Sequence, residues 1–424
     1  MYQYKVRITD EILKEKLAGK GAVLIEGPKW CGKTTSAKQI AGSTVYMDDP
    51  RNRKQNMTLA ETEPEILLRG NTPRLIDEWQ LAPRLWDSIR FEVDRRQAFG
   101  QFILTGSSVP ADMSEVSHTG TGRIARLKMR PMSLYESGEA NGTVSLSALF
   151  EKDGTVCGSS SLTLDDVAFL VCRGGWPMAT YLTEKLALNQ AFDYYESVVG
   201  SDISRADKVT RDPEKAKRIL RSLARNQGSQ IGEDTIVADI SVNEEEGTSR
   251  TTVHSYIEAL KKIFVIEDLP AWNPNLRSKT AIRTSDTRYF VDPSIAAAAL
   301  GFGPGDLIGD LNTFGFMFET LAIRDLRVYS QALGGGVYRY RDKNGLECDA
   351  VVHLPNGKYG LIEIKLGGDK LIDDGCKALL RLSEMIDTDK MKKPSFLMVL
   401  TANGELAYRN KEGVLIVPIG ALGA

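Results

Sequence analysis

The stretch that decides the fold is Ala22-Val23-Leu24-Ile25-Glu26-Gly27-Pro28-Lys29-Trp30-Cys31-Gly32-Lys33-Thr34-Thr35. Its first five residues have the apolar pattern of a short buried strand, and residues 35–41 are helical in composition, so the glycines lie in a strand-to-helix loop. Glycines at this spacing let backbone N–H groups curl around phosphate oxygens, and the helix N-terminus adds partial positive charge. The stretch therefore predicts a phosphate-binding loop.

Two side chains of this loop have distinct predicted roles. The spacing Gly-x-x-x-x-Gly-Lys-Thr directs Lys33 to the β and γ phosphates of a nucleoside triphosphate and the Thr34 hydroxyl to Mg²⁺. The alternative is an ordinary glycine-rich turn, which the strand-to-helix context disfavours. The residues expected to contact ATP are Gly27, Pro28, Lys29, Trp30, Cys31, Gly32, Lys33, Thr34 and Thr35.

A second predicted strand ends in two carboxylates, in the sequence Pro73-Arg74-Leu75-Ile76-Asp77-Glu78. One carboxylate at such a strand end can hold a metal ion while the next polarises the attacking water. We assign Asp77 to Mg²⁺ and Glu78 to the water. An isolated Asp-Glu pair is more often a solvated strand end, but this pair follows a phosphate loop.

A third predicted strand, residues 101–105, leads into a turn rich in hydroxyl groups. In the additional-strand class of P-loop ATPases, the strand between the two motif strands ends in a polar residue that senses the γ-phosphate or the attacking water. Thr105 and Ser107 are the candidates for this role. A plain turn after a strand is the alternative.

Together these motifs resemble the AAA-type ATPases of bacteria and archaea whose motor domain is followed by a C-terminal domain of unknown function. The resemblance implies an α/β, additional-strand, AAA+-like P-loop domain over residues 1–138. It also implies self-association, as a ring with a hexamer favoured, in which Arg123 reaches the γ-phosphate in a neighbouring subunit. A basic surface loop is the alternative for Arg123. The segments that carry the resemblance are residues 27–35, residues 75–80 with Pro83, residues 104–108, residues 122–124 and residues 131–134.

The middle of the chain is predicted to be mainly helical. Residues 139–164 are rich in Gly, Ser and Thr and suggest an exposed link, so residues 139–212 are interpreted as a linker and a helical, lid-like segment. Residues 213–300 have the layout of a winged helix, with residues 249–260 as recognition helix. Phosphate contacts of DNA are predicted for Arg250, Arg277, Lys279 and Arg283. A solvated face or a protein-docking winged helix is the alternative.

Residues 301–424 are predicted to form a second α/β unit. Asp349 lies on one predicted strand, and Glu363 and Lys365 share a face of the next, because side chains alternate along a strand. With Glu319 from a preceding helix, these groups could hold a divalent metal and place a water. The set resembles the Asp…Glu-x-Lys core of restriction-endonuclease-like folds, which are widely reused after losing catalysis, and the usual proline before Asp349 is missing.

The composition excludes several classes of protein. The formal net charge is −2, so any nucleic-acid surface must be local. No apolar run approaches the roughly 20 residues of a membrane-spanning helix, and we expect no membrane partner. Five cysteines without paired spacing and an N-terminus without an apolar signal region favour a reducing cytoplasm.

Three functions are compatible with these patterns. The first, which we favour, is an ATP- and Mg²⁺-dependent ring-forming motor that binds and remodels or translocates DNA. The second is an ATP-gated, metal-dependent nuclease that uses the C-terminal acidic residues. The third is a nucleotide switch that binds protein partners.

Overall fold

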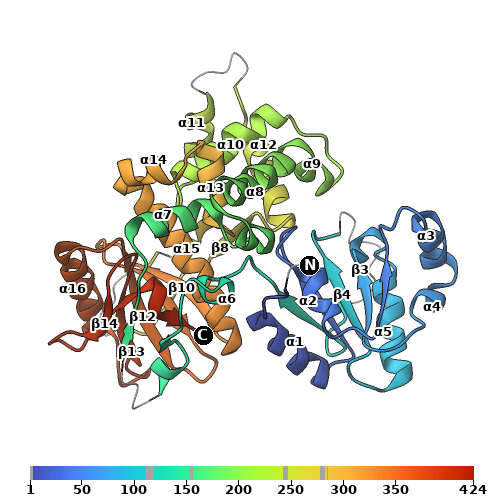
Figure 1. The fold of residues 1–424 in the computed structure, drawn as a ribbon, viewed down its shortest axis with the longest axis horizontal. Coiled ribbons are helices and arrows are strands. Elements are labelled where there is room, and N and C mark those ends of the chain that lie inside the picture. The colour runs from blue at the N-terminus through green and yellow to red at the C-terminus, as the bar shows by residue number, and fades with distance from the viewer. Residues whose placement is uncertain (1–2, 111–118, 152–155, 242–246, 277–281, 284) are drawn as a thin grey trace.

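A computed structural model describes residues 3–110, 119–151, 156–241, 247–276, 282–283 and 285–424 of the chain. These residues form three lobes, seen in Figure 1 as an α/β lobe at right, a helical lobe at the top and a second α/β lobe at lower left. Within the described residues, no helix is long and apolar enough to cross a membrane.

The N-terminal lobe is built on a five-stranded parallel sheet with the order β2-β3-β4-β1-β5. Its strands are β1 (Ala22–Glu26), β2 (Ser43–Tyr46), β3 (Arg74–Asp77), β4 (Phe102–Gly106) and β5 (Ile124–Lys128). Its helices are α1 (Ile8–Gly19), α2 (Lys33–Lys38), α3 (Arg53–Thr62), α4 (Pro64–Leu67) and α5 (Leu85–Arg96). Strand β4 lies between β1 and β3, which is the order expected of the additional-strand class. Both faces of this sheet carry a hydrophobic core, which explains the continuous apolar run of β1.

The helical lobe follows. Its helices are α6 (Leu134–Ser137), α7 (Leu164–Arg173), α8 (Glu184–Ser197), α9 (Ile203–Arg205), α10 (Pro213–Arg225), α11 (Glu233–Ser241), α12 (Arg250–Lys262), α13 (Pro293–Leu300) and α14 (Pro304–Gly309). A π-helical turn, Val198–Asp202, joins α8 to α9. Helices α10, α11 and α12 precede an antiparallel hairpin of β8 (Ile266–Leu269) and β9 (Thr287–Phe290).

The connection between β8 and β9 does not project as a free wing in its described part. Ala271 bridges to Arg339 and Ile282 bridges to Asp342, so the connection runs along the C-terminal sheet. Trp272 is buried against that sheet. The reason is that an edge strand has unpaired backbone groups, and the connection covers them.

The C-terminal lobe contains a seven-stranded mixed sheet with the order β10-β11-β12-β13-β15-β14-β7. Its elements are α15 (Leu311–Ala332), β10 (Gly336–Arg341), β11 (Glu347–His353), β12 (Tyr359–Lys365), α16 (Asp369–Met385), β13 (Phe396–Thr401), β14 (Leu406–Arg409), β15 (Leu415–Pro418) and β16 (Leu422–Gly423). Strands β10, β11 and β12 form an antiparallel meander, and β13 is parallel to β12.

The Gly- and Ser-rich stretch of residues 139–164 differs from the exposed link that its composition suggests. Strand β7 (Gly158–Ser159) pairs with β14 at the edge of the C-terminal sheet, and β6 (Val144–Ser145) pairs with β16. Backbone hydrogen bonds make these contacts, and side-chain composition does not reveal such bonds. This stretch therefore belongs to the C-terminal lobe by its contacts.

The helical and C-terminal lobes share one continuous hydrophobic core, whereas the N-terminal lobe has its own cores. The 22-residue helix α15 runs between the two lobes and is buried along most of its length. Residues 213–300 and 301–424 are therefore packed as one body, although they follow one another as distinct units in the sequence.

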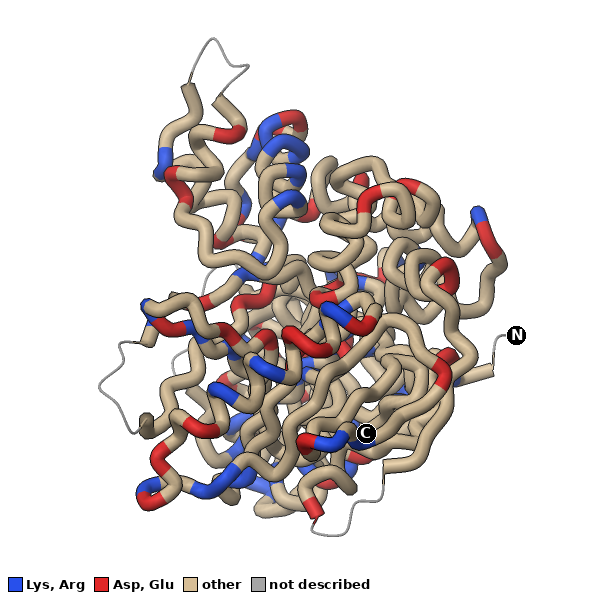
Figure 2. Tube along the Cα trace, turned by 90° about the vertical axis from the view of Figure 1, so that its left-hand side faces the viewer, with Lys and Arg blue, Asp and Glu red and all other residues tan. Residues whose placement is uncertain are grey.

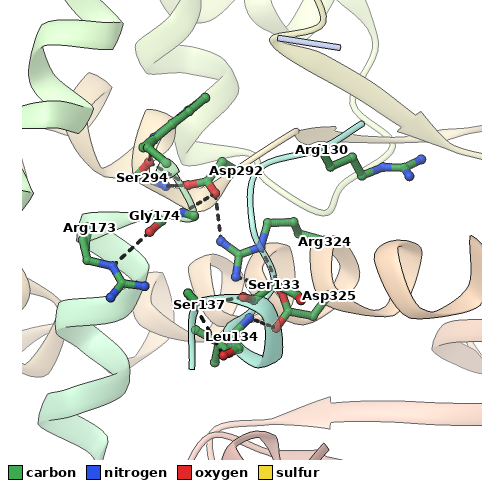
Figure 3. Close-up of polar contacts among 12 residues, drawn as sticks. Arg130, Ser133, Leu134, Ser137, Arg173, Gly174, Asp292, Ser294, Arg324 and Asp325 are labelled. Carbon is green, nitrogen blue, oxygen red and sulfur yellow. Dashed lines mark hydrogen bonds and ion pairs between the residues drawn. The ribbon is translucent and has the colours of Figure 1, made fainter. Parts of the chain in front are cut away.

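Buried Arg324 of α15 links the C-terminal lobe to the helical lobe, and Figure 3 shows its polar contacts. Its guanidinium is 1% exposed and pairs with Asp292 at 2.8 Å and with Asp325 at 2.7 Å. Asp325 also accepts a hydrogen bond from the backbone N–H of Leu134, and Asp292 accepts one from Gly175. A buried ion pair is stable only where its remaining hydrogen-bonding groups are satisfied, as they are for these aspartates.

Glycines are needed where the chain turns beside this network. A Cβ atom on Gly174 would lie 2.4 Å from the Ser294 hydroxyl, and one on Gly175 would lie 2.1 Å from the Met132 carbonyl oxygen. Trp176 follows and donates its indole N–H to Ser294 at 2.9 Å. The Gly175-Trp176-Pro177 turn is therefore a packing corner.

Candidate nucleotide site

The predicted phosphate loop connects β1 to α2 and closes around its own lysine. The Lys33 ammonium group donates to the carbonyl oxygens of Gly27 at 2.9 Å and Pro28 at 2.7 Å, so its charge lies inside the loop. A Cβ on Gly27 would lie 2.0 Å from the Met129 carbonyl oxygen, and Gly32 has φ of +100°. The loop therefore requires glycine at both positions.

The carboxylate at the end of β3 meets hydroxyl groups from two other elements. The Thr34 hydroxyl at the start of α2 donates to Asp77 at 2.7 Å, and the Thr105 hydroxyl at the end of β4 donates to the same oxygen. Asp77 is 7% exposed. Hydroxyl and carboxylate oxygens are the donors that Mg²⁺ prefers, so Thr34 and Asp77 fit this ion.

Glu78 is held in an unusual backbone conformation beside the same edge. Its φ and ψ are 56° and 46°, in the left-handed region, which costs a non-glycine residue about 1–3 kcal/mol. The Ser107 hydroxyl donates to its carboxylate at 2.9 Å, and the Gln80 amide also contacts it. The structure therefore brings both predicted sensor residues, Thr105 and Ser107, to the predicted acidic pair. Gln80 is a neighbour that the sequence did not single out.

A cavity of about 1450 Å³ between the N-terminal and helical lobes is lined by Lys33, Thr34, Asp77, Glu78 and Ser107. Two contacts join the loop to the helical lobe: Lys29 pairs with Asp202 at 2.6 Å, and the rings of Trp30 and Tyr194 lie 5.8 Å apart. Tyr194 stacks on Trp176 at 4.1 Å. Sequence reasoning placed Lys29 and Trp30 in the loop but missed these partners, because they come from a distant part of the chain.

Arg7 also contacts the phosphate loop, although no motif in the sequence points to it. Its guanidinium is buried, pairs with Glu136 at 3.1 Å and donates to the loop carbonyl of Cys31 at 2.8 Å. Burial alone would lower the pKa of Arg7, but Glu136 holds it above its ordinary value. Arg7 therefore fixes the loop backbone as a permanent cation.

Arg123 lies far from the loop of its own chain. It precedes β5, and because β5 is parallel to β1, this position is at the opposite end of the sheet from the loop. Its guanidinium pairs with Asp94 at 2.8 Å and is 48% exposed. An action on a neighbouring subunit therefore stays a prediction.

The structure describes two of the four predicted DNA contacts, Arg250 and Arg283. Arg250, at the start of α12, pairs with Glu233 at 3.3 Å and with Asp234 at 3.4 Å while remaining 65% exposed. Arg283 is exposed, and its backbone N–H donates to Arg341 at 2.8 Å. Arg277 and Lys279 lie outside the described residues. Figure 2 shows basic and acidic residues interspersed over most of the face that it presents, with a run of basic residues along one helix near the top.

The four acidic and basic residues of the C-terminal motif do come together. Lys365 pairs with Glu363 at 2.6 Å and with Asp349 at 3.2 Å, so the two neighbouring strands bring these side chains to one face. Glu319 of α15 reaches the same cluster through Arg339, which the sequence analysis had not singled out. The sequence offers one weak sign of Arg339, which is its charge within the alternating segment Tyr338-Arg339-Tyr340-Arg341.

Three family profiles match separate parts of the chain. An AAA domain matches residues 19–138, and two domains of unknown function, DUF8612 and DUF4143, match residues 164–306 and 314–422. Together with the loop and the acidic strand end, the first match makes the N-terminal lobe an AAA-type P-loop ATPase domain.

Curated relatives are distant and uncharacterized. Proteins of Mycobacterium bovis and Mycobacterium tuberculosis are each 23% identical over 355 residues, which is 83% of this chain and 72% of theirs. A Haemophilus influenzae protein is 24% identical over 47% of this chain and 46% of its own.

Two solved structures show weak similarity. A Walker-type ATPase of Pyrococcus abyssi is 14% identical, with a TM-score of 0.40, covering 68% of this chain and 94% of its own. The Aeropyrum pernix ORC1 protein in complex with DNA is 13% identical, with a TM-score of 0.23, covering 72% and 92%.

Proposed function

We propose that this chain hydrolyses ATP with Mg²⁺ at the edge formed by β1, β3 and β4, and that it uses the energy to remodel or translocate DNA as a ring-forming motor. The observation that carries the ATPase part is the convergence on Asp77 of hydroxyl groups from Thr34 and Thr105. Three separate segments of the chain bring complementary groups together at Asp77. An ordinary glycine-rich turn would not require this arrangement.

The proposed chemistry follows from the positions of these groups. Mg²⁺ held by Thr34 and Asp77 would supply charge neutralisation on the phosphates. Lys33 donates to the phosphate oxygens, and Glu78 accepts the proton of the attacking water as the new oxygen–phosphorus bond forms and the bond to the β-phosphate oxygen breaks. Ser107 orients the Glu78 carboxylate through their 2.9 Å hydrogen bond. Arg123 would stabilise the transferred phosphoryl group of a neighbouring subunit.

DNA binding is supported by the order of α10, α11, α12 and the β8–β9 hairpin. Arg250 at the exposed start of α12 would exchange its carboxylate partners for a DNA phosphate. This exchange costs little free energy, because an exposed ion pair contributes about 0–1 kcal/mol to the stability of the protein. Arg283, with Arg277 and Lys279, would add contacts from the β8–β9 connection.

The experiment measures phosphate release by the wild-type chain with single-stranded, duplex and branched DNA, and by Lys33→Ala as the inactive control. We expect magnesium-dependent turnover that DNA raises, and a loss of about 10²–10³-fold in Lys33→Ala. Mass determination with bound nucleotide tests the ring. Turnover that Lys33→Ala retains contradicts the ATPase site, whereas turnover indifferent to DNA contradicts the DNA role and favours a nucleotide switch.

An ATP-gated nuclease is a second candidate by residue type, because Asp349, Glu363 and Lys365 meet on neighbouring strands, although the cations beside these carboxylates argue against it. The sequence of α15, three antiparallel strands, α16 and a parallel strand supports a restriction-endonuclease-like fold. Metal-dependent cutting that disappears in Glu363→Ala or Lys365→Ala would support this function.

A further inference from the structure

Arg339 of β10 lies among the residues of the nuclease-like cluster. Its guanidinium is 2.7 Å from Glu319, 3.6 Å from Asp349 and 3.1 Å from Glu347, and it is only 9% exposed. A planar guanidinium with several donors can serve several carboxylates at once. It therefore already supplies positive charge between α15 and β11, where a divalent metal shared by Glu319 and Asp349 would have to lie.

Lys365 supplies the second positive charge of the cluster. Its ammonium group lies 2.6 Å from Glu363 and 3.2 Å from Asp349, and that Asp349 oxygen also accepts the backbone N–H of Ile364 at 2.9 Å. Each carboxylate of the motif therefore has a cationic nitrogen beside it. Among the residues that the structure describes, no group of three or more His, Cys, Asp or Glu is arranged to hold a metal ion.

The winged-helix region covers the cluster from the other side. Arg339 donates to the Gly228 carbonyl oxygen at 3.0 Å and to the Tyr289 hydroxyl at 2.8 Å, and that hydroxyl in turn donates to Glu319. Gly228 approaches so closely that a Cβ there would lie 3.0 Å from the Glu319 carboxylate. On this side the described residues Gly228 and Tyr289 therefore pack directly on Arg339 and Glu319.

We propose that Arg339 is the resident cation of this cluster: it takes the place of a divalent metal and fastens the winged-helix region to the C-terminal sheet. The motif residues consequently do not fit a metal, and the C-terminal lobe does not cut DNA in this arrangement. This inference concerns a separate site and does not rest on ATP hydrolysis.

The first test compares Mn²⁺ binding by the full-length wild-type chain and by Asp349→Asn, without nucleotide, using electron paramagnetic resonance of the free ion. We expect equal binding by the two proteins, and no nicking of plasmid DNA by either with Mn²⁺. One additional Mn²⁺ bound per wild-type chain, or nicking that Asp349→Asn abolishes, would overturn the proposal.

The second test removes the resident cation with Arg339→Met, which has an apolar side chain of comparable reach. We expect this variant to melt at a lower temperature, to gain one Mn²⁺ site that Arg339→Met/Asp349→Asn lacks, and to be stabilised by Mn²⁺. Arg341→Met is the matched control, because Arg341 lies on the same strand, also pairs with Glu347 and is 32% exposed.

The control should melt closer to the wild type and gain no Mn²⁺ site. A folded Arg339→Met that neither gains this site nor melts below Arg341→Met would contradict the proposal. Should Arg339→Met fail to fold while Arg341→Met folds, the fastening role is supported, and the comparison of wild type with Asp349→Asn decides the metal question.

Discussion

Two acidic clusters of the described chain lie on strands, and they differ in the groups that surround their carboxylates. At the end of β3, Asp77 and Glu78 receive hydrogen bonds from the neutral hydroxyl groups of Thr34, Thr105 and Ser107 and face a large cavity. In the C-terminal lobe, the acidic residues pair with Arg339 and Lys365, and Gly228 and Tyr289 contact Arg339.

The difference shows that the neighbours of a carboxylate decide its use. A hydroxyl group orients a carboxylate but leaves its charge available for a metal ion or a proton, whereas a buried guanidinium or ammonium neutralises that charge permanently. Similar motifs in the sequence can therefore yield a candidate catalytic site in one lobe and an ion-pair network in the other. The same substitution made in both clusters tests this distinction.

Glu78→Gln should give the largest effect. Because it removes the group that accepts the proton of the attacking water, we expect ATP turnover to fall by about 10²–10⁴-fold while ATP affinity is retained. Phosphate release and calorimetric ATP binding measure the two quantities. Hydrolysis at the wild-type rate would show that the water-polarising group has been misassigned.

Asp77→Asn should weaken the magnesium dependence of nucleotide binding. The amide keeps the shape of the side chain but loses the charge that attracts the ion, so we expect about 10²-fold weaker Mg²⁺-ATP binding. Titrations of ATP with and without Mg²⁺ provide the measurement. Asp349→Asn is the matched control in the other cluster, and an equal loss in that variant would break the comparison.

Glu363→Gln should change the pH dependence of stability and leave ATP turnover unchanged. Because the folded-state pKa of Glu363 is raised to about 8 by burial and Asp349, its stabilising contribution is complete below the ordinary pKa of 4.5 and is lost as pH rises to 8. In the wild type this decline in the free energy of unfolding is at most about 1.4 kcal/mol per pH unit, and the substitution removes it.

Urea unfolding between pH 5 and 8 measures this slope. Glu384→Gln, a change at an exposed residue of α16, is the control and should keep the wild-type slope. Identical slopes for Glu363→Gln and the wild type would show that the buried carboxylate does not retain its proton.

Thr105→Val should have the smallest of these effects. It removes one hydroxyl hydrogen bond to Asp77 at nearly constant volume, and a hydrogen bond to a charged group is worth about 1.5–3 kcal/mol. Because Thr34 still donates to the same Asp77 oxygen, we expect the lower end of this range, which is a fall in turnover of roughly 10-fold. Steady-state phosphate release is the measurement. Unchanged turnover would remove Thr105 from the site and leave Ser107 as the remaining sensor candidate.

Local patterns in the sequence predicted a large part of the nucleotide site. The loop glycines, Lys33 and Thr34 are neighbours in the chain, and Asp77 and Thr105 each end an apolar strand. Because parallel strands bring their carboxyl ends to one edge, strand-end positions are sufficient to predict their meeting. The particular roles assigned to Glu78 and Arg123 remain predictions for experiment.

The residues that the sequence did not reveal act over long separations. Arg7 supports the loop from a preceding segment, and Asp202 and Tyr194 reach it from the helical lobe. Arg339 sits in a strand whose tyrosines and arginines alternate without a recognisable motif. Nothing local distinguishes these residues, because their importance depends on which buried groups they neutralise or cover.

The sequence by itself determined the phosphate loop and its acidic partner strand, since the chemistry of both depends on the order of neighbouring residues. Only the tertiary structure decided which cations pair with the C-terminal acidic residues and which strands pair with the Gly- and Ser-rich stretch. The physical reason is that charge neutralisation and backbone pairing depend on proximity in space. The 2.7 Å contact of Arg339 with Glu319 joins residues from different elements that no spacing rule connects.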